Sequence, residues 1–250
     1  MAILWSRDDG DTRYEVRTAG ATRRLYTNGV FHSQYNPRQP VTGSVWDLLT
    51  LPAFFAPQSV QRVLMLGVGG GAAIRQLNHF LQPELIVGVE LNPVHLQVAR
   101  RFFDVAAPNV KLHRADALRW VKAYRGPRFD MIIDDLFSHA DGDPQRVVAA
   151  DGRWFRQLGR LMTPHGLLVT NFGSIEELSS CAWYEDVRIR ADYPAAFRLT
   201  APRYDNAVGV FLRRPASSLQ LRRNLAVIPE LDASRRSCRL NYVIRRLQAG

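Results

Sequence analysis

The stretch VLMLGVGGGA at residues 63–72 decides the fold that we expect for this chain. A buried strand that turns at once into a helix needs glycines, because they tolerate positive φ and let a ligand approach the backbone. Glu90 follows Gly71 by nineteen residues and ends a second apolar run, 85–90. A helix beginning near Ala72 would point its amides at the bound group, and Glu90 would accept hydrogen bonds from ribose hydroxyls. The pattern predicts a nucleoside-binding βαβ unit.

Composition limits the class of protein. At 250 residues and 46% hydrophobic content the chain is long enough for one α/β domain with a small appendage. The sequence lacks an apolar run of membrane-spanning length and a secretory signal, which predicts a cytoplasmic protein without a membrane span. Cys181 and Cys238 are too few for a disulfide framework or a metal cluster, so we expect no metal.

Positive charge is concentrated at the C-terminal end. The formal net charge is +10, and residues 213–250 hold nine arginines against Glu230 and Asp232. Such a tail is suited to an acidic partner, a membrane surface, nucleic acid or the protein's own carboxylates. Because the rest of the chain is close to neutral, nucleic acid is allowed as a partner but not favoured.

The chain divides into four segments. Residues 11–35 alternate polar and apolar side chains around Asn28-Gly29, which predicts a β-hairpin. Apolar residues at helical spacing follow Ser44, a candidate N-cap. We expect a small β region over 1–43, a linker helix over 44–62, a Rossmann-like domain over 63–214 and an arginine-rich tail over 215–250.

Strands and helices alternate through the third segment. After the fifth strand the pattern changes, and 197–200 with 207–212 predict an antiparallel hairpin. A parallel sheet closed by such a hairpin is typical of the methyltransferase-type α/β fold, so we expect a mostly parallel, seven-stranded sheet. The expected strands are 63–66, 85–90, 110–113, 129–134 and 166–171, and the expected helices are 72–81, 93–103, 117–124 and 151–162.

The carboxyl ends of these strands should hold the ligand, as in other open parallel sheets. Asp116 follows the third strand, where its carboxylate would accept a hydrogen bond from an adenine amino group while the amide of Ala117 meets the ring. Alternatively Asp116 only caps the helix that begins at Ala117, and the two roles are compatible. The candidate nucleoside-binding residues are Gly67, Gly69, Gly70, Gly71, Glu90, Asp116 and Ala117.

Asp135 is the candidate catalytic residue. It follows the fourth strand, where a carboxylate would hold or deprotonate an amine. Alternation along a strand puts neighbouring side chains on opposite faces, so Asp134 should be a structural neighbour. The alternative is that both are solvated loop carboxylates.

These motifs resemble the spermidine synthase-like branch of the class I S-adenosylmethionine-dependent transferases. The resemblance implies binding of S-adenosylmethionine or its decarboxylated form, with Glu90 on the ribose, Asp116 near the adenine and Asp135 as the catalytic acid. It also implies a small-molecule acceptor such as an amine, and it allows a homodimer. The matching segments are 25–30, 51–52, 63–72, 129–135 and 202–211.

The chain departs from this family at three polar positions. Gly70 stands where the family carries an Asp. The family's Tyr-Gln pair corresponds to a place near Ser44-Val45 in this chain, and the family's second Asp to a place near Ser138. Each lost contact to a polyamine costs about 1.5 to 3 kcal/mol. Asp141, Asp143, Tyr35 or Tyr204 could compensate.

Several functions therefore stay open. Methyl transfer is the leading hypothesis, because Gly70 would leave room for the methionine carboxylate, and aminopropyl transfer is the alternative. A non-catalytic nucleoside-binding protein that engages an acidic partner through its tail is a second class. A nicotinamide-dependent oxidoreductase is a third, disfavoured by the closing hairpin and Asp116. Trp46, Phe137 and Tyr204 are either walls of the acceptor pocket or core residues.

Overall fold

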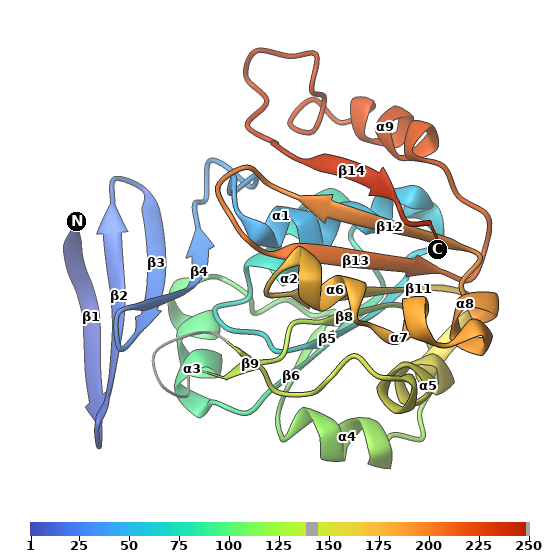
Figure 1. Cartoon of the computed structure of the whole chain (residues 1–250). Coiled ribbons are helices and arrows are strands. Elements are labelled where there is room, and N and C mark those ends of the chain that lie inside the picture. Colours follow the sequence, from blue (N-terminus) through green and yellow to red (C-terminus); the bar gives the residue numbers. More distant parts are fainter. Residues whose placement is uncertain (139–144, 249–250) are drawn as a thin grey trace.

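The computed structural model describes residues 1–138 and 145–248, and a central β-sheet organises them (Figure 1). The strand order across this sheet is β14-β12-β13-β11-β8-β5-β6-β7. The strands are β5 (Arg62–Leu66), β6 (Leu85–Glu90), β7 (Val110–Arg114), β8 (Phe129–Asp134), β11 (Met162–Phe172), β12 (Ala195–Thr200), β13 (Ala207–Leu212) and β14 (Val243–Arg246).

The sheet confirms the predicted fold class. Strands β7, β6, β5, β8 and β11 pair in parallel, whereas β13 runs antiparallel to both β11 and β12. The chain builds the sheet outward from β5 in one direction and then, from β8, in the other. The carboxyl ends of β5 and β8 therefore flank the point where the strand order reverses, which is where open α/β sheets bind ligands.

The described part of the sheet has eight strands, one more than the seven expected from the sequence. The additional strand, β14, comes from the arginine-rich tail and pairs antiparallel with β12. The tail is thus partly built into the sheet, and its helix α9 (Ser218–Ala226) contributes Leu221 and Leu225 to the core.

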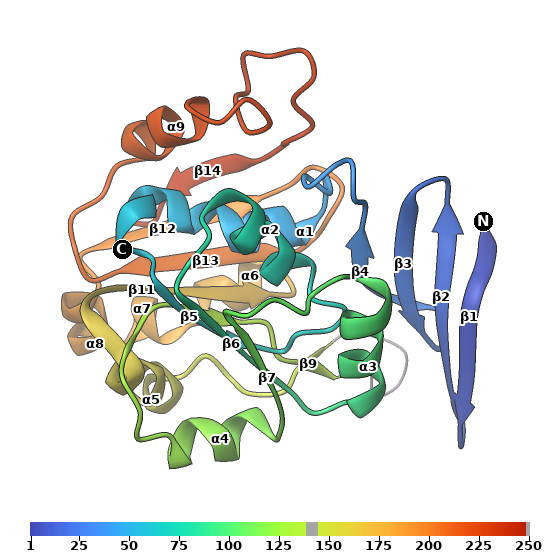
Figure 2. The same ribbon diagram turned by 180° about the vertical axis from the view of Figure 1, so that it is seen from behind.

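The N-terminal region is a four-stranded antiparallel sheet, larger than the expected hairpin. Asn28 and Gly29 both have positive φ, 48° and 81°, so the predicted Asn-Gly turn is confirmed. Figures 1 and 2 show this sheet beside the main body, with β4 nearest to it. Its strands are β1 (Ala2–Asp9), β2 (Thr12–Ala19), β3 (Thr22–Thr27) and β4 (Val30–Tyr35).

The helices differ from the prediction mainly by short additions. Ser44 precedes α1 as expected, but its Oγ pairs with the Tyr204 hydroxyl instead of capping the helix. The helices are α1 (Val45–Thr50), continued by the 3-10 turns Leu51–Phe55 and Pro57–Ser59, α2 (Ala72–Phe80), α3 (Pro93–Phe102), α4 (Ala117–Ala123), α5 (Gly152–Leu161), α6 (Ile175–Ser179), α7 (Ala182–Glu185) and α8 (Val187–Asp192). A small ribbon of β9 (Phe137–Ser138) and β10 (Gln145–Arg146) follows β8.

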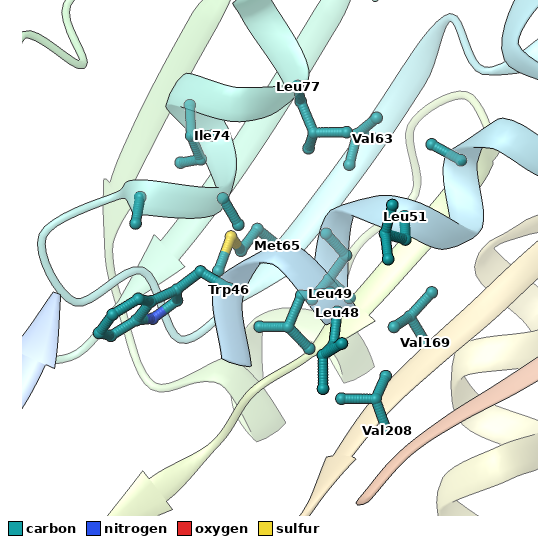
Figure 3. Packing of buried hydrophobic residues seen from close by; sticks show 14 of the residues in the cluster. Trp46, Leu48, Leu49, Leu51, Val63, Met65, Ile74, Leu77, Val169 and Val208 are labelled. Atoms are coloured by element: carbon teal, nitrogen blue, oxygen red, sulfur yellow. The ribbon is translucent and has the colours of Figure 1, made fainter. Parts of the chain in front are cut away.

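Two hydrophobic clusters cover the two faces of the central sheet. Val63 and Met65 of β5 belong to one cluster, with α1, α2, α3 and α9, part of which is drawn in Figure 3. Leu64 and Leu66 belong to the other, with α4, α5 and α6 to α8. Burial on both faces explains why this strand is a continuous apolar run. No helix in the described ranges is both long and apolar enough to cross a membrane.

The eighth strand gives a direct test of how firmly the tail is anchored. Ile244 is 9% exposed and lies opposite Leu199, whereas the adjacent Val243 is 46% exposed. We expect Ile244→Ala to lower the free energy of unfolding by about 2 kcal/mol, because it leaves a cavity in the core. Val243→Ala should change it by less than about 0.5 kcal/mol. Urea denaturation measures both, and equal effects would contradict the pairing of β14.

Candidate functional site

The glycine loop after β5 lies directly against the chain that follows β8. Gly67 has φ +81°, and a Cβ atom there would lie 2.1 Å from the carbonyl oxygen of Asp135. The Asp135 amide in turn donates to the Leu66 carbonyl at 2.9 Å. Only glycine is compatible with this approach, which brings the candidate nucleoside-binding loop next to the candidate catalytic residue.

Glu90 holds the same loop from the neighbouring strand. Its Oε2 accepts hydrogen bonds from the amides of Val68 and Gly69, each at 3.0 Å, and its Oε1 accepts one from the amide of Asn92 at 2.8 Å. A carboxylate has about four lone-pair sites, so Glu90 keeps capacity for a ribose hydroxyl. Its role toward ribose stays a prediction.

Strand β4 packs onto the other side of the glycine loop. A Cβ atom at Gly70 would lie 2.6 Å from the Ser33 Cβ and 3.1 Å from the Phe103 ring. The Ser33 Oγ accepts a hydrogen bond from the amide of Ala72 at 3.3 Å, so it serves the first turn of α2. Ser33 therefore fills the direction in which a side chain at position 70 would point. This removes the reason why Gly70 favoured methyl transfer, because the glycine opens no free space there.

Asp116 lies where the sequence places it, at the start of α4. Its Oδ1 accepts from the Arg119 amide at 2.9 Å, so the capping role is present. Within the described ranges its second oxygen accepts no hydrogen bond. Ala117 follows as the first residue of the helix and is buried. One carboxylate oxygen of Asp116 is therefore available as an acceptor, and its role toward adenine stays a prediction.

Asp134 is sealed inside the protein. It has no exposed surface and accepts hydrogen bonds from Arg146 Nη2 at 2.7 Å and Trp154 Nε1 at 3.0 Å. Arg146 is itself buried and also donates to the Asn171 carbonyl. An unpaired ionised carboxylate in such a place is strongly unfavourable, so the ion pair explains why Asp134 is tolerated there. The sequence signal for Arg146 is indirect: a buried Asp134 needs a positively charged partner, and this need alone does not identify which arginine provides it.

Asp135, the next residue, is half-buried. Its Oδ1 accepts a hydrogen bond from Asn171 Nδ2 at 2.8 Å, and Asn206 Nδ2 donates to the Asn171 Oδ1 at 3.2 Å. Burial raises the pKa of Asp135 to about 6, against the opposing effect of the Asn171 hydrogen bond. Sequence reasoning missed Asn171 and Asn206, since nothing local marks either as a partner of Asp135. The pKa suits a carboxylate that takes up a proton near neutral pH.

The remaining candidates from the sequence lie in different places. Tyr204 reaches the linker, where its hydroxyl is 2.7 Å from the Ser44 Oγ. Tyr35 lies below the Arg75 guanidinium, 4.6 Å from it, and Trp46 is a buried core residue. Asp141 and Asp143 lie outside the described residues.

Comparison of the sequence with known proteins gives the following similarities. The profile of the methyltransferase domain family matches residues 63–166. The polyamine aminopropyltransferase of Chromobacterium violaceum is 29% identical over 118 residues, which cover 46% of this chain and 43% of that protein. Polyamine aminopropyltransferase 2 of Caldanaerobacter subterraneus is 26% identical over 144 residues, covering 56% and 48%. The chain thus matches less than half the length of these curated relatives.

Solved structures share the fold over most of the chain. A probable spermidine synthase from Corynebacterium glutamicum has a TM-score of 0.67 at 20% identity, covering 90% of this chain and 88% of that one. A spermidine synthase in complex with the transition state analogue AdoDATO has a TM-score of 0.63 at 13% identity, covering 90% and 77%. Human methyltransferase-like protein 13 in complex with SAH has a TM-score of 0.57 at 16% identity, covering 72% and 87%.

The buried ion pair under the site yields a stability prediction. Arg146→Met should lower the free energy of unfolding by about 3 to 5 kcal/mol, because Asp134 is left charged and unpaired. The double variant Asp134→Asn with Arg146→Met removes the charge as well and should recover part of that loss. Urea denaturation of both variants measures the difference. A double variant no more stable than the single one would show that the ion pair is not the reason.

Proposed function

We propose that this chain transfers a group from an adenosyl sulfonium donor to a small-molecule acceptor. It belongs to the spermidine synthase-like family within the class I S-adenosylmethionine-dependent methyltransferase fold. The observation that carries the proposal is Asp135, a half-buried carboxylate whose backbone is in contact with the glycine loop. In this place it would meet an acceptor that lies next to the donor.

The group transferred is an aminopropyl group, and the donor is decarboxylated S-adenosylmethionine. The names of the curated relatives support this choice over methyl transfer. The sequence favours methyl transfer because Gly70 would leave room for the methionine carboxylate. This reason no longer holds, since Ser33 fills the space into which a side chain at position 70 would point. Methyl transfer from S-adenosylmethionine remains the second candidate, because the methyltransferase domain profile matches residues 63–166.

Three side chains and the glycine loop would have separate roles in binding the donor and the acceptor. Glu90 would bind the ribose, and Asp116 with the amide of Ala117 would bind the adenine. The sulfonium supplies an already activated carbon, so positioning provides most of the catalysis. Asp135 would hold the acceptor amine and accept its proton as the new nitrogen–carbon bond forms and the sulfur–carbon bond breaks.

Donor preference tests this function directly. In calorimetric titrations we expect decarboxylated S-adenosylmethionine to bind more tightly than S-adenosylmethionine, and NAD not to bind. Turnover with an amine should release methylthioadenosine. Preference for S-adenosylmethionine with release of S-adenosylhomocysteine would establish methyl transfer instead, and preference for NAD would overturn both.

Asp116→Asn separates the two roles of that residue. Asn is as good an N-cap as Asp, so α4 should keep its stability. Its amide has a single acceptor oxygen, which the Arg119 amide already occupies at this position. We expect donor affinity to fall about tenfold at an unchanged melting temperature. Glu90→Ala should weaken binding as well, but it also releases the loop amides, so it is the less specific variant.

The pKa of Asp135 predicts the acidic limb of the pH profile. Since burial raises this pKa to about 6, the carboxyl becomes protonated as the pH falls through about 6 and can no longer accept a proton. We expect kcat/KM to fall below that pH, and Asp135→Asn to be inactive. Asn171→Ala should move the limb to higher pH, because its hydrogen bond lowers the pKa.

The raised pKa of Asp135 also predicts that replacing this carboxylate stabilises the folded protein while it removes activity. A carboxyl whose pKa is raised on folding destabilises the folded state at pH values above that pKa. Asp135→Asn should therefore raise the melting temperature at pH 7 while abolishing activity. An active Asp135→Asn variant, or a pH profile without a limb near 6, would contradict the role of Asp135.

A further inference from the structure

A groove of about 620 Å³ lies between the N-terminal sheet, the linker before α1 and the β12–β13 connection. Strands β3 and β4, the linker before α1, the β12–β13 connection and the tail before β14 all contribute to it. Both views show the β12–β13 connection next to β4 (Figures 1 and 2). Its lining includes Arg24, Arg203 and Arg239, and no aspartate or glutamate is among its described lining residues.

We propose that this groove binds an anionic group of the acceptor, such as a carboxylate or a phosphate, so that the acceptor is an amine with an acidic end and not a polyamine. This inference rests on the proposed function for the transfer step. The binding of the anion itself does not depend on it.

The positive charge of the groove is not neutralised locally. Within the described residues none of its three arginines forms an ion pair. Arg24 is held in place, since its Nε donates to Gln34 Oε1 at 3.0 Å and its guanidinium lies 5.6 Å from the centre of the Phe31 ring. Arg203 and Arg239 are exposed to solvent. Arginines arranged around a concave surface attract carboxylates and phosphates and repel cations.

The groove is joined to the site through shared segments. Tyr204 lines the groove and pairs with Ser44, another lining residue, while Asn206 of the same turn donates to Asn171, the partner of Asp135. Phe31 and Gln34 of β4 line the groove from the face of the hairpin that carries Arg24, whereas Ser33 contacts the glycine loop from the opposite face. An acceptor anchored by its acidic end in the groove would therefore reach Asp135 by extending along the turn that carries Tyr204 and Asn206.

The shape of the groove favours a small molecule over nucleic acid. Its volume is within the range of about 300 to 1,000 Å³ that is usual for small-ligand pockets. Its walls also carry polar side chains that could fix an orientation, including Asn36, Gln39 and Thr42. A nucleic-acid surface instead needs a track of cations along successive phosphates.

Calorimetric titration of the full chain at low ionic strength tests the groove. The probes are inorganic pyrophosphate for phosphate groups, citrate for carboxylates and spermidine as a cation. We expect at least one anion to bind and spermidine not to bind. Arg203→Gln with Arg239→Gln should weaken anion binding by about tenfold or more. Arg153→Gln with Arg188→Gln removes the same charge from exposed positions outside the groove and should leave the affinity unchanged.

The outcomes are distinct. Binding of pyrophosphate alone or of citrate alone supports the inference and identifies the class of anion. Failure of both anions, equal weakening in the two double variants, or binding of spermidine in the groove would overturn it. A single-stranded oligonucleotide that binds through Arg203 and Arg239 while both small anions fail would assign the surface to nucleic acid. Failure of the proposed function would appear separately, as lost binding of both adenosyl donors with anion binding intact.

Discussion

The contact between the α-carbon of Gly67 and the backbone of Asp135 is the constraint on which the site depends. It is possible only without a side chain at position 67, and the Asp135 amide fixes it by donating to Leu66. Glu90 then holds the rest of the loop through the amides of Val68 and Gly69. The ends of three adjacent strands are thereby tied together through the backbone. A larger residue at 67 would separate the loop from Asp135 even if every other side chain were kept.

Two adjacent carboxylates in such a place would repel each other, and the structure separates their roles. Asp134 is neutralised by Arg146, whose guanidinium also holds the carbonyl of Asn171. The side chain of Asn171 then donates to Asp135. The buried ion pair therefore positions the strand end from which Asp135 receives its hydrogen bond. Burial and the charge of Asp134 raise the pKa of Asp135, while Asn171 and Arg146 lower it, and burial is the largest of these effects.

The features that the sequence predicted depend on short-range patterns. The apolar strands, the Asn-Gly turn and the glycine loop each lie within a few consecutive residues, so their physical requirements can be recognised locally. Ser33, Arg146 and Asn171 act through partners far along the chain, and nothing in their own neighbourhood marks them. Strand β14 has four residues, mostly exposed, and forms only because the edge of β12 accepts it. Helices α6 to α8 are too short for a clear periodicity.

The glycine-loop side and the proposed acceptor side of the site differ in charge. On the side of the glycine loop, Glu90 accepts hydrogen bonds from the loop amides and Asp116 caps α4, and their roles toward a nucleoside stay predictions of the resemblance. On the proposed acceptor side the groove carries Arg24, Arg203 and Arg239, whereas Gly70, where the family carries an Asp, faces Ser33. The positive charge of the proposed acceptor side therefore comes from the three arginines and not from the glycine at position 70. Since β3, the β12–β13 connection and the tail before β14 each supply one of these arginines, the charge that the proposed acceptor would meet comes from three segments far apart in the sequence.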